Sequence, residues 1–86
     1  MAKEIKKHEI PDLDKETIKR IAAKAKDMRK EAGYSYEGFA LHAGLNRNTY
    51  FKFEKSAATG ENFTMATLLK VVRGLEQTLR SFFETL

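Results

Sequence analysis

The chain has 86 residues and no cysteine, so we expect a single small domain without disulfides or thiolate metal sites. No apolar run reaches the roughly 18 residues of a membrane helix, and no secretory signal follows the N-terminal lysines, so a cytoplasmic protein is expected. A formal net charge of +4 and a pI near 9.4 suit a polyanionic partner, although charge alone argues only weakly for nucleic-acid binding.

Residues 1–13 are expected to form an arm outside the domain, because they show no helical period and contain the only proline, Pro11. Three interpretations stay open: a solvated tail, a basic arm that reaches along DNA, or a segment whose Ile5 and Ile10 pack on a partner subunit. The domain is predicted to span residues 14–86.

The first helix is predicted from an apolar stripe whose members recur at steps of three and four residues. They are Ile18, Ile21, Ala25, Met28 and Ala32. Asp12 or Asp14 is expected to cap the start of this helix, and Gly33 to end it. Four lysines off the stripe are interpreted as a solvated face: Lys15, Lys19, Lys26 and Lys30.

Two short helices joined by a tight turn at Gly44 are predicted within residues 34–54. The first, capped by Ser35, has an inward stripe of Phe39, Ala40 and Ala43. The second, capped by Asn46, is expected to turn Tyr50, Phe53 and Ala57 inward. Its opposite side carries Arg47, Asn48, Phe51, Lys52 and Lys55. This spacing is typical of a helix-turn-helix.

A loop is predicted over residues 55–63, which are small and polar and include Gly60. Thr64 is expected to cap a fourth helix with an inward stripe of Met65, Leu68, Val72 and Leu75. A final short helix follows Thr78 and carries Leu79, Phe82, Phe83 and Leu86. Part of that face closes the core. Phe83 and Leu86 exceed what a terminal helix needs, so they are predicted to help form a two-fold dimer interface.

These residues resemble the Cro and phage-repressor family (XRE family) of helix-turn-helix domains. The pattern comprises Ala40, Gly44, Leu45, Asn46, Tyr50, Phe53 and Glu54. Arg29 lies four residues before Gly33, and the run FTMATLLKVVRGLEQTLRSFF looks like that family's fourth and fifth helices. The resemblance covers roughly residues 14–86, and it implies an all-α, five-helix, repressor-like DNA-binding domain.

The resemblance implies that bases are read by the start of the third helix and by one residue a turn later. These residues are Arg47, Asn48 and Lys52, with Thr49 as a weaker candidate. Arginine can pair with guanine and asparagine with adenine, whereas a lysine can reach a guanine or a phosphate. Phe51 either touches a thymine methyl or a sugar, or is shielded by the following loop or by Tyr50.

Three further roles follow from the resemblance. Tyr36 stands where most family members have a glutamine that touches a phosphate, so it is either a phosphate donor or a packing residue. The loop meets phosphates through its amides and Asn62, or is a plain connector. Arg29 and Glu54 are implied to form a structural ion pair, the alternative being two independent surface charges.

The predicted function is therefore a DNA-binding transcriptional regulator, more commonly a repressor, that binds an inverted repeat in double-stranded DNA as a homodimer. The alternative is a protein-interaction module or antitoxin-type component with the same fold. No cofactor or metal is expected. An enzyme is disfavoured because His8 and His42 lie in different segments without a nucleophile arrangement, and His42 is interpreted as a surface residue.

Overall fold

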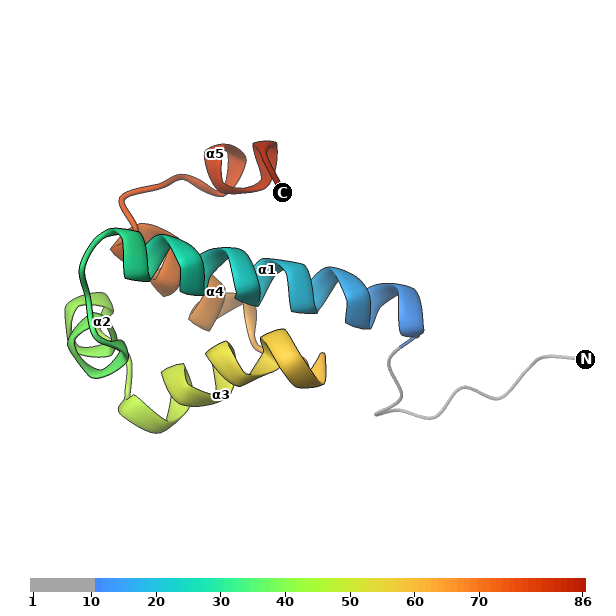
Figure 1. Cartoon of the computed structure of the whole chain (residues 1–86), viewed down its shortest axis with the longest axis horizontal. Coiled ribbons are helices and arrows are strands. Elements are labelled where there is room, and N and C mark those ends of the chain that lie inside the picture. Colours follow the sequence, from blue (N-terminus) through green and yellow to red (C-terminus); the bar gives the residue numbers. More distant parts are fainter. Residues whose placement is uncertain (1–10) are drawn as a thin grey trace, which may run out of the picture.

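The computed structural model describes residues 11–86, and this part of the chain forms five α-helices and no strand (Figure 1). The helices are α1 (Asp12–Glu31), α2 (Tyr36–Ala43), α3 (Arg47–Thr59), α4 (Met65–Gly74) and α5 (Leu79–Glu84). The prediction of an all-α chain with five helices is confirmed for the described residues.

The start of α1 differs from the predicted domain boundary at residue 14. Asp12 and Leu13, assigned to the arm, form the first turn of the helix, and residues 1–10 lie outside the described part of the chain. The prediction that Asp12 or Asp14 caps α1 is wrong, because Pro11 occupies the cap position with a φ of −57°. Proline has no N–H to satisfy there, and both carboxylates lie in the first turn, where the helix dipole favours them.

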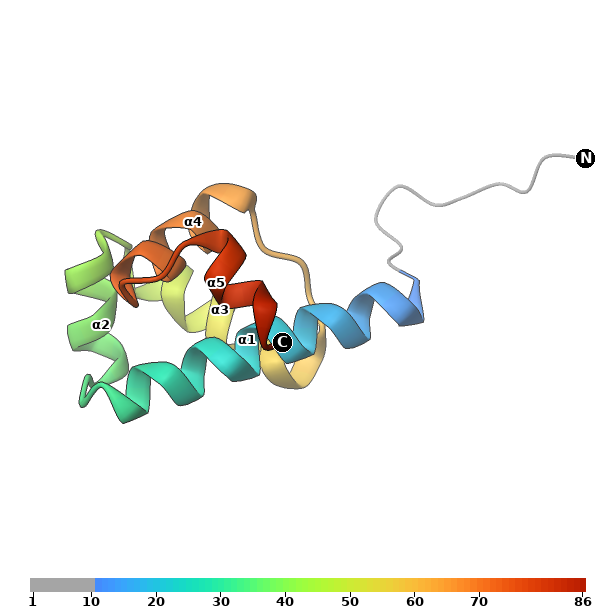
Figure 2. The ribbon, with the colours of Figure 1, turned by 90° about the horizontal axis from the view of Figure 1, so that it is seen from above.

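The core lies where the five helices meet, and α5 contributes the buried ring of Phe82. Helix α1 packs along α3, α2 contacts both α3 and α4, and α5 contacts α4. The N-terminal turns of α1 extend past the other helices in both views, which is why Leu13 is exposed (Figures 1 and 2). The buried apolar side chains are Ile21, Ala22, Ala25, Phe39, Ala40, Tyr50, Phe53, Leu68, Val71, Val72 and Phe82. Burial of one large apolar side chain contributes about 1.5–3 kcal/mol, so this cluster holds the helices together.

The apolar stripes are confirmed at their centres and wrong at two ends. Ala32 was predicted inward but is exposed, because α1 ends at Glu31 and the chain turns away. Met65 was also predicted inward, yet 61% of its surface is exposed. It is the first residue of α4 and lies beyond the core. This helix contacts the core through Leu68 and Val72, as predicted, and through Val71, which was not predicted.

Three predicted side-chain caps are confirmed, and the structure adds a fourth at Thr78, the residue after which the last helix was predicted to begin. In each, the side-chain oxygen accepts a hydrogen bond from a backbone N–H in the first turn of the following helix. The caps are Ser35 for α2, Asn46 for α3, Thr64 for α4 and Thr78 for α5. These short polar residues determine where four of the five helices begin.

Helix α3 is longer than predicted, because residues 55–59, predicted as loop, continue it to Thr59. Ser56 is buried, and its hydroxyl donates to the carbonyl of Lys52 at 3.1 Å, so a polar residue is accommodated inside the helix. Gly60 ends the helix with a φ of +71°. A Cβ at Gly60 would also lie only 3.1 Å from the side chain of Lys15. The helix therefore stops where α1 passes closely.

Helix α5 is held beside α1 by polar contacts as well as by the buried ring of Phe82. The Lys24 ammonium donates to the carbonyl of Phe82 and to the hydroxyl of Thr85, and it lies 4.8 Å from the centre of the Phe82 ring. Arg20 donates to the carbonyl of Leu86 at 2.7 Å. Lys24 and Arg20 of α1 thus satisfy two carbonyls in residues 82–86. Figure 2 shows the C-terminal end of α5 lying beside α1.

Candidate nucleic-acid interface

The turn between α2 and α3 is built from three consecutive residues. Gly44 adopts the left-handed conformation with a φ of +74°, which a side chain would disfavour. The N–H of Leu45 donates to the carbonyl of Ala40 at 2.8 Å, and this closes the end of α2. The side chain of Asn46 accepts from the N–H of Asn48 at 2.8 Å and starts α3. The turn therefore fixes the direction in which α3 leaves α2.

One side of α3 is buried and the other is exposed. Tyr50 and Phe53 lie in the core. The opposite side, here called the outer face of α3, comprises five exposed residues: Arg47, Asn48, Phe51, Lys52 and Lys55. Thr49, at the edge of this face, is also exposed. All of the residues predicted to read bases are thus accessible on one helix, and the face offers guanidinium, amide and ammonium groups.

Arg47 is paired with an acidic residue of α2. One guanidinium nitrogen lies 3.2 Å from a carboxylate oxygen of Glu37, and both side chains are more than half exposed. The sequence analysis did not predict this pair, because a separation of ten residues across a turn leaves no periodic signal. An exposed pair of this kind contributes about 1 kcal/mol or less, so Arg47 can leave it for another acceptor at small cost.

Tyr36 and Phe51 lie beside each other at the junction of α2 and α3. Their ring centres are 6.2 Å apart, and the ammonium of Lys55 lies 5.7 Å from the centre of the Phe51 ring. Tyr36 is partly buried against the core, as its packing interpretation expects, and half of Phe51 is exposed. The structure pairs the ring of Phe51 with Tyr36 and not with Tyr50.

The loop after α3 borders the other edge of the outer face. Thr49 and Lys52 line a small hollow of about 160 Å³ together with Asn62, Phe63 and Thr64. Phe63 anchors the loop, since its ring centre lies 4.8 Å from that of buried Phe53, whereas Asn62 is exposed. Polar groups from two elements therefore flank α3 on this side.

Arg29 and Glu54 form the ion pair that the resemblance implies. Two guanidinium nitrogens of Arg29 lie 2.6 and 3.2 Å from the two carboxylate oxygens of Glu54, and a third donates to the carbonyl of Tyr34 at 2.6 Å. The hydroxyl of Tyr50 donates to the same carboxylate. The pair ties α1 to α3 and to the α1–α2 connection, so it holds α3 in place and is not part of the outer face of α3.

This cluster shifts two proton equilibria. The hydrogen bond to Glu54 raises the pKa of Arg29 above its ordinary value, so the guanidinium stays charged. Burial, followed by the hydrogen bond to the Glu54 carboxylate, raises the pKa of Tyr50 well above its usual value near 10. The hydroxyl of Tyr50 therefore stays protonated and remains a donor.

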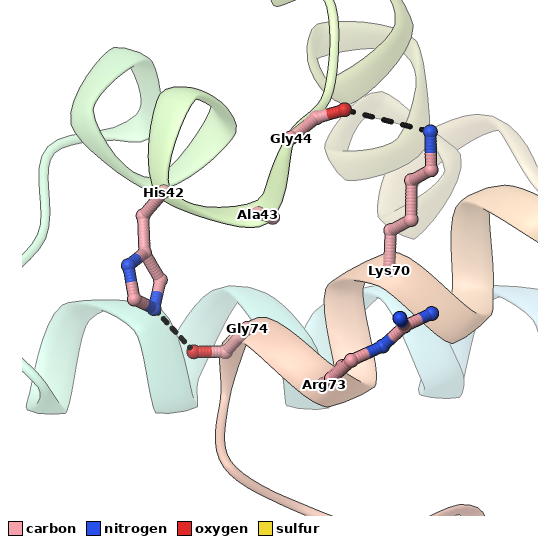
Figure 3. A pocket seen from close by; sticks show the side chains of 6 residues that line it. All are labelled: His42, Ala43, Gly44, Lys70, Arg73 and Gly74. Carbon is pink, nitrogen blue, oxygen red and sulfur yellow. Dashed lines mark hydrogen bonds between the residues drawn. The ribbon is translucent and has the colours of Figure 1, made fainter.

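A second hollow lies where α2 and α4 end (Figure 3). It measures about 450 Å³, and its basic side chains are His42, Lys70 and Arg73. Figure 3 shows two of them turned toward backbone carbonyls: a ring nitrogen of His42 lies 3.1 Å from the Gly74 oxygen, and the Lys70 ammonium lies 3.5 Å from the Gly44 oxygen. These groups satisfy free carbonyls at helix C-termini, where the helix dipole already favours cations. We interpret the hollow as a helix-capping arrangement.

The two predicted dimer residues are placed differently. Phe83 is exposed and its ring packs edge-on against buried Phe82. Leu86 is only partly buried and packs against the core of its own chain. The expectation that both extend beyond the core is therefore wrong for Leu86, because the chain end folds back onto α1.

Residues 11–86 were also searched for a metal site and for a membrane-spanning helix. Within this range no three His, Asp or Glu side chains lie close enough together to hold a metal ion. None of the helices described is long and apolar enough to cross a membrane. His42 is exposed, as predicted, although its ring also stacks on Tyr34 with centres 4.9 Å apart, and His8 lies outside the described residues.

Comparison of the chain with protein-family models, with curated proteins and with solved structures found no match.

Proposed function

We propose that this chain is a sequence-specific DNA-binding regulator of transcription, in which α2, the turn at Gly44 and α3 form a helix-turn-helix within a repressor-like domain. The observation that carries the proposal is the outer face of α3. Its exposed side chains all belong to one helix, and an α-helix with its side chains is about as wide as the major groove, roughly 12 Å.

The residues at the start of α3 have the chemistry that base reading requires. Arg47 can donate two hydrogen bonds to guanine, and Asn48 can pair with the donor and acceptor of adenine. Lys52, one turn later, can reach a guanine or a phosphate, and Thr49 can add a contact at the edge. Each good pair of hydrogen bonds discriminates against a wrong base by about 1–3 kcal/mol.

Groups on both sides of α3 suit phosphate binding. Tyr36 is the first residue of α2 and lies on one side, while Asn62 in the loop lies on the other. A hydroxyl and an amide can each donate to a phosphate oxygen and so fix the position of α3 in the groove. The net charge of +4 favours the encounter with DNA.

The regulator is proposed to act as a homodimer that binds an inverted repeat and represses by blocking polymerase. Exposed Phe83 supplies an apolar group for a two-fold interface, in which each residue contributes twice. Such a dimer places its two recognition helices about 34 Å apart, one turn of DNA.

A second candidate function has one observation in its favour. Phe51 presents an aromatic ring in the middle of the outer face, and aromatic residues are enriched where proteins bind proteins. A protein-interaction module, such as an antitoxin-type component, would use the same face to hold a protein partner.

The deciding experiment is selection of bound sequences from a random duplex library, followed by measurement of affinity against salt concentration. The expected result is an enriched inverted repeat, with log affinity falling steeply against log salt. Asn48→Ala should then lose the preference at one base pair, whereas the matched control Asn62→Ala should weaken all sequences alike. If no sequence is enriched and the weak binding vanishes at physiological salt, the DNA-binding function is contradicted. The outer face of α3 would then be assigned to binding a protein partner.

A further inference from the structure

Phe51 is a large apolar side chain among cations and an amide, and its position on α3 is well defined. Arg47, Phe51 and Lys55 follow one another at steps of four residues and so form a single ridge along the helix. Half of the Phe51 surface is exposed. The ridge therefore presents a cation, an aromatic ring and a second cation in succession.

Two contacts hold the Phe51 ring in place. Tyr36 of α2 packs beside it at 6.2 Å between ring centres, and the Lys55 ammonium lies 5.7 Å from its centre. Both contacts restrict the orientation of the Phe51 ring. The partly buried Tyr36 limits the movement of the Phe51 ring, and the Lys55 cation is attracted to the face of that ring. The ring is thus oriented before any ligand arrives, and its remaining surface faces outward.

The major groove offers such a ring one kind of apolar group. Base edges there present hydrogen-bond donors and acceptors, apart from the C5 methyl group of thymine. Cytosine presents the same methyl group only when it is methylated at C5. Phe51 shares the outer face of α3 with Asn48, which is proposed to read a base, and it contacts Tyr36 of α2, which is proposed to meet the backbone.

We propose that Phe51 is a specificity-determining residue that contacts the C5 methyl group of a pyrimidine in the bound DNA. This inference rests on the proposed function and adds to it the chemistry of one further position. The preferred site carries a thymine there, and 5-methylcytosine at that position binds better than cytosine.

The test removes only the methyl group. Each thymine of the selected duplex is replaced in turn by deoxyuridine, and the dissociation constant is measured by fluorescence anisotropy. One position in each half-site should lose about fourfold in affinity, the value of one buried methyl group. A second duplex set carries cytosine or 5-methylcytosine at that position, and the methylated form should bind about fourfold more tightly.

Protein variants link the effect to this ring. With Phe51→Ala, the dissociation constants of the uracil and thymine duplexes should differ by a factor of about one, because the ring that contacts the methyl group is gone. The two substitutions, one in the protein and one in the DNA, form a double-mutant cycle. Leu13→Ala, which removes an exposed apolar side chain from the far end of α1, should keep the fourfold ratio. Circular dichroism confirms that each variant is folded.

The outcomes separate the two proposals. Specific, salt-dependent binding with no uracil-sensitive position, or with a ratio that persists in Phe51→Ala, overturns the role of Phe51 and leaves the regulator in place. Failure of any duplex to bind specifically overturns the proposed function and this inference together.

Discussion

Arg29 and Glu54 face each other across the interface of α1 and α3 with 2.6 Å between Nε and Oε2, and their side chains are only 9% and 13% exposed. A charge left alone in such a place cannot be solvated well. We therefore expect Arg29→Met or Glu54→Leu to cost about 3–5 kcal/mol, and the double variant to cost much less than the sum.

Thermal melts of the three variants measure this coupling. A single variant that loses 3 kcal/mol should melt at least about 12 °C lower, since a domain of this size loses roughly 4–8 °C per kcal/mol. Strictly additive losses would show that the two charges act independently, as surface charges do.

Tyr50 gives the same cluster a dependence on alkaline pH. In the unfolded chain this tyrosine loses its proton near pH 10, whereas burial beside the Glu54 carboxylate raises its pKa in the folded protein. Above pH 10 the unfolded state therefore binds fewer protons than the folded state. The stability from this group is complete below pH 10 and falls above it by up to about 1.4 kcal/mol per pH unit.

Comparison with Tyr50→Phe isolates this contribution. The variant lacks the hydroxyl that donates to a charged group, so it should be about 1.5–3 kcal/mol less stable at pH 7. Its stability should decline less steeply between pH 10 and 11 than that of the parent chain. Parallel stability curves for the two proteins would contradict a raised pKa.

The starts of α2 to α5 were predictable from the sequence, whereas the start of α1 and the ends of the buried stripes were not. A cap such as Ser35 or Asn46 depends on residues two or three positions away, so local chemistry identifies it. Met65 continues the helical period of its stripe, so the sequence alone predicts that it is buried. Its exposure follows from where the neighbouring helices end, which is a property of the whole fold.

The candidate site shows the same division. The periodicity of α3 predicted which side of the helix is exposed, and that side carries Arg47, Asn48 and Lys52 as expected. The pairing of Arg47 with Glu37 and the bond from Tyr50 to Glu54 involve side chains brought together by a turn or by burial. No periodic pattern encodes such contacts, so they appeared only with the structure.

Gly44 should control the direction of α3 through its backbone conformation. Nothing lies within 4 Å of a Cβ built at this position, so Gly44→Ala meets no steric obstacle. Its cost is the left-handed φ of +74°, about 1–2 kcal/mol for alanine and less for asparagine, which tolerates this conformation. Thermal melts should rank the parent first, then Gly44→Asn, then Gly44→Ala. An alanine variant as stable as the parent would mean that the turn relaxes without loss.

The proposed dimer depends on Phe83 more than on Leu86, because Leu86 already packs within its own chain. Phe83 is exposed, and a two-fold interface would contain it twice. Phe83→Ala should therefore weaken dimerisation by at least about 2 kcal/mol, or roughly 30-fold in the dissociation constant, without a matching loss of thermal stability in the monomer. Sedimentation equilibrium over a range of concentrations measures this change, with Leu13→Ala as the matched loss of an exposed apolar side chain. A parent chain that stays monomeric at every concentration would remove the dimer from the mechanism, and the selected DNA site should then be a single half-site.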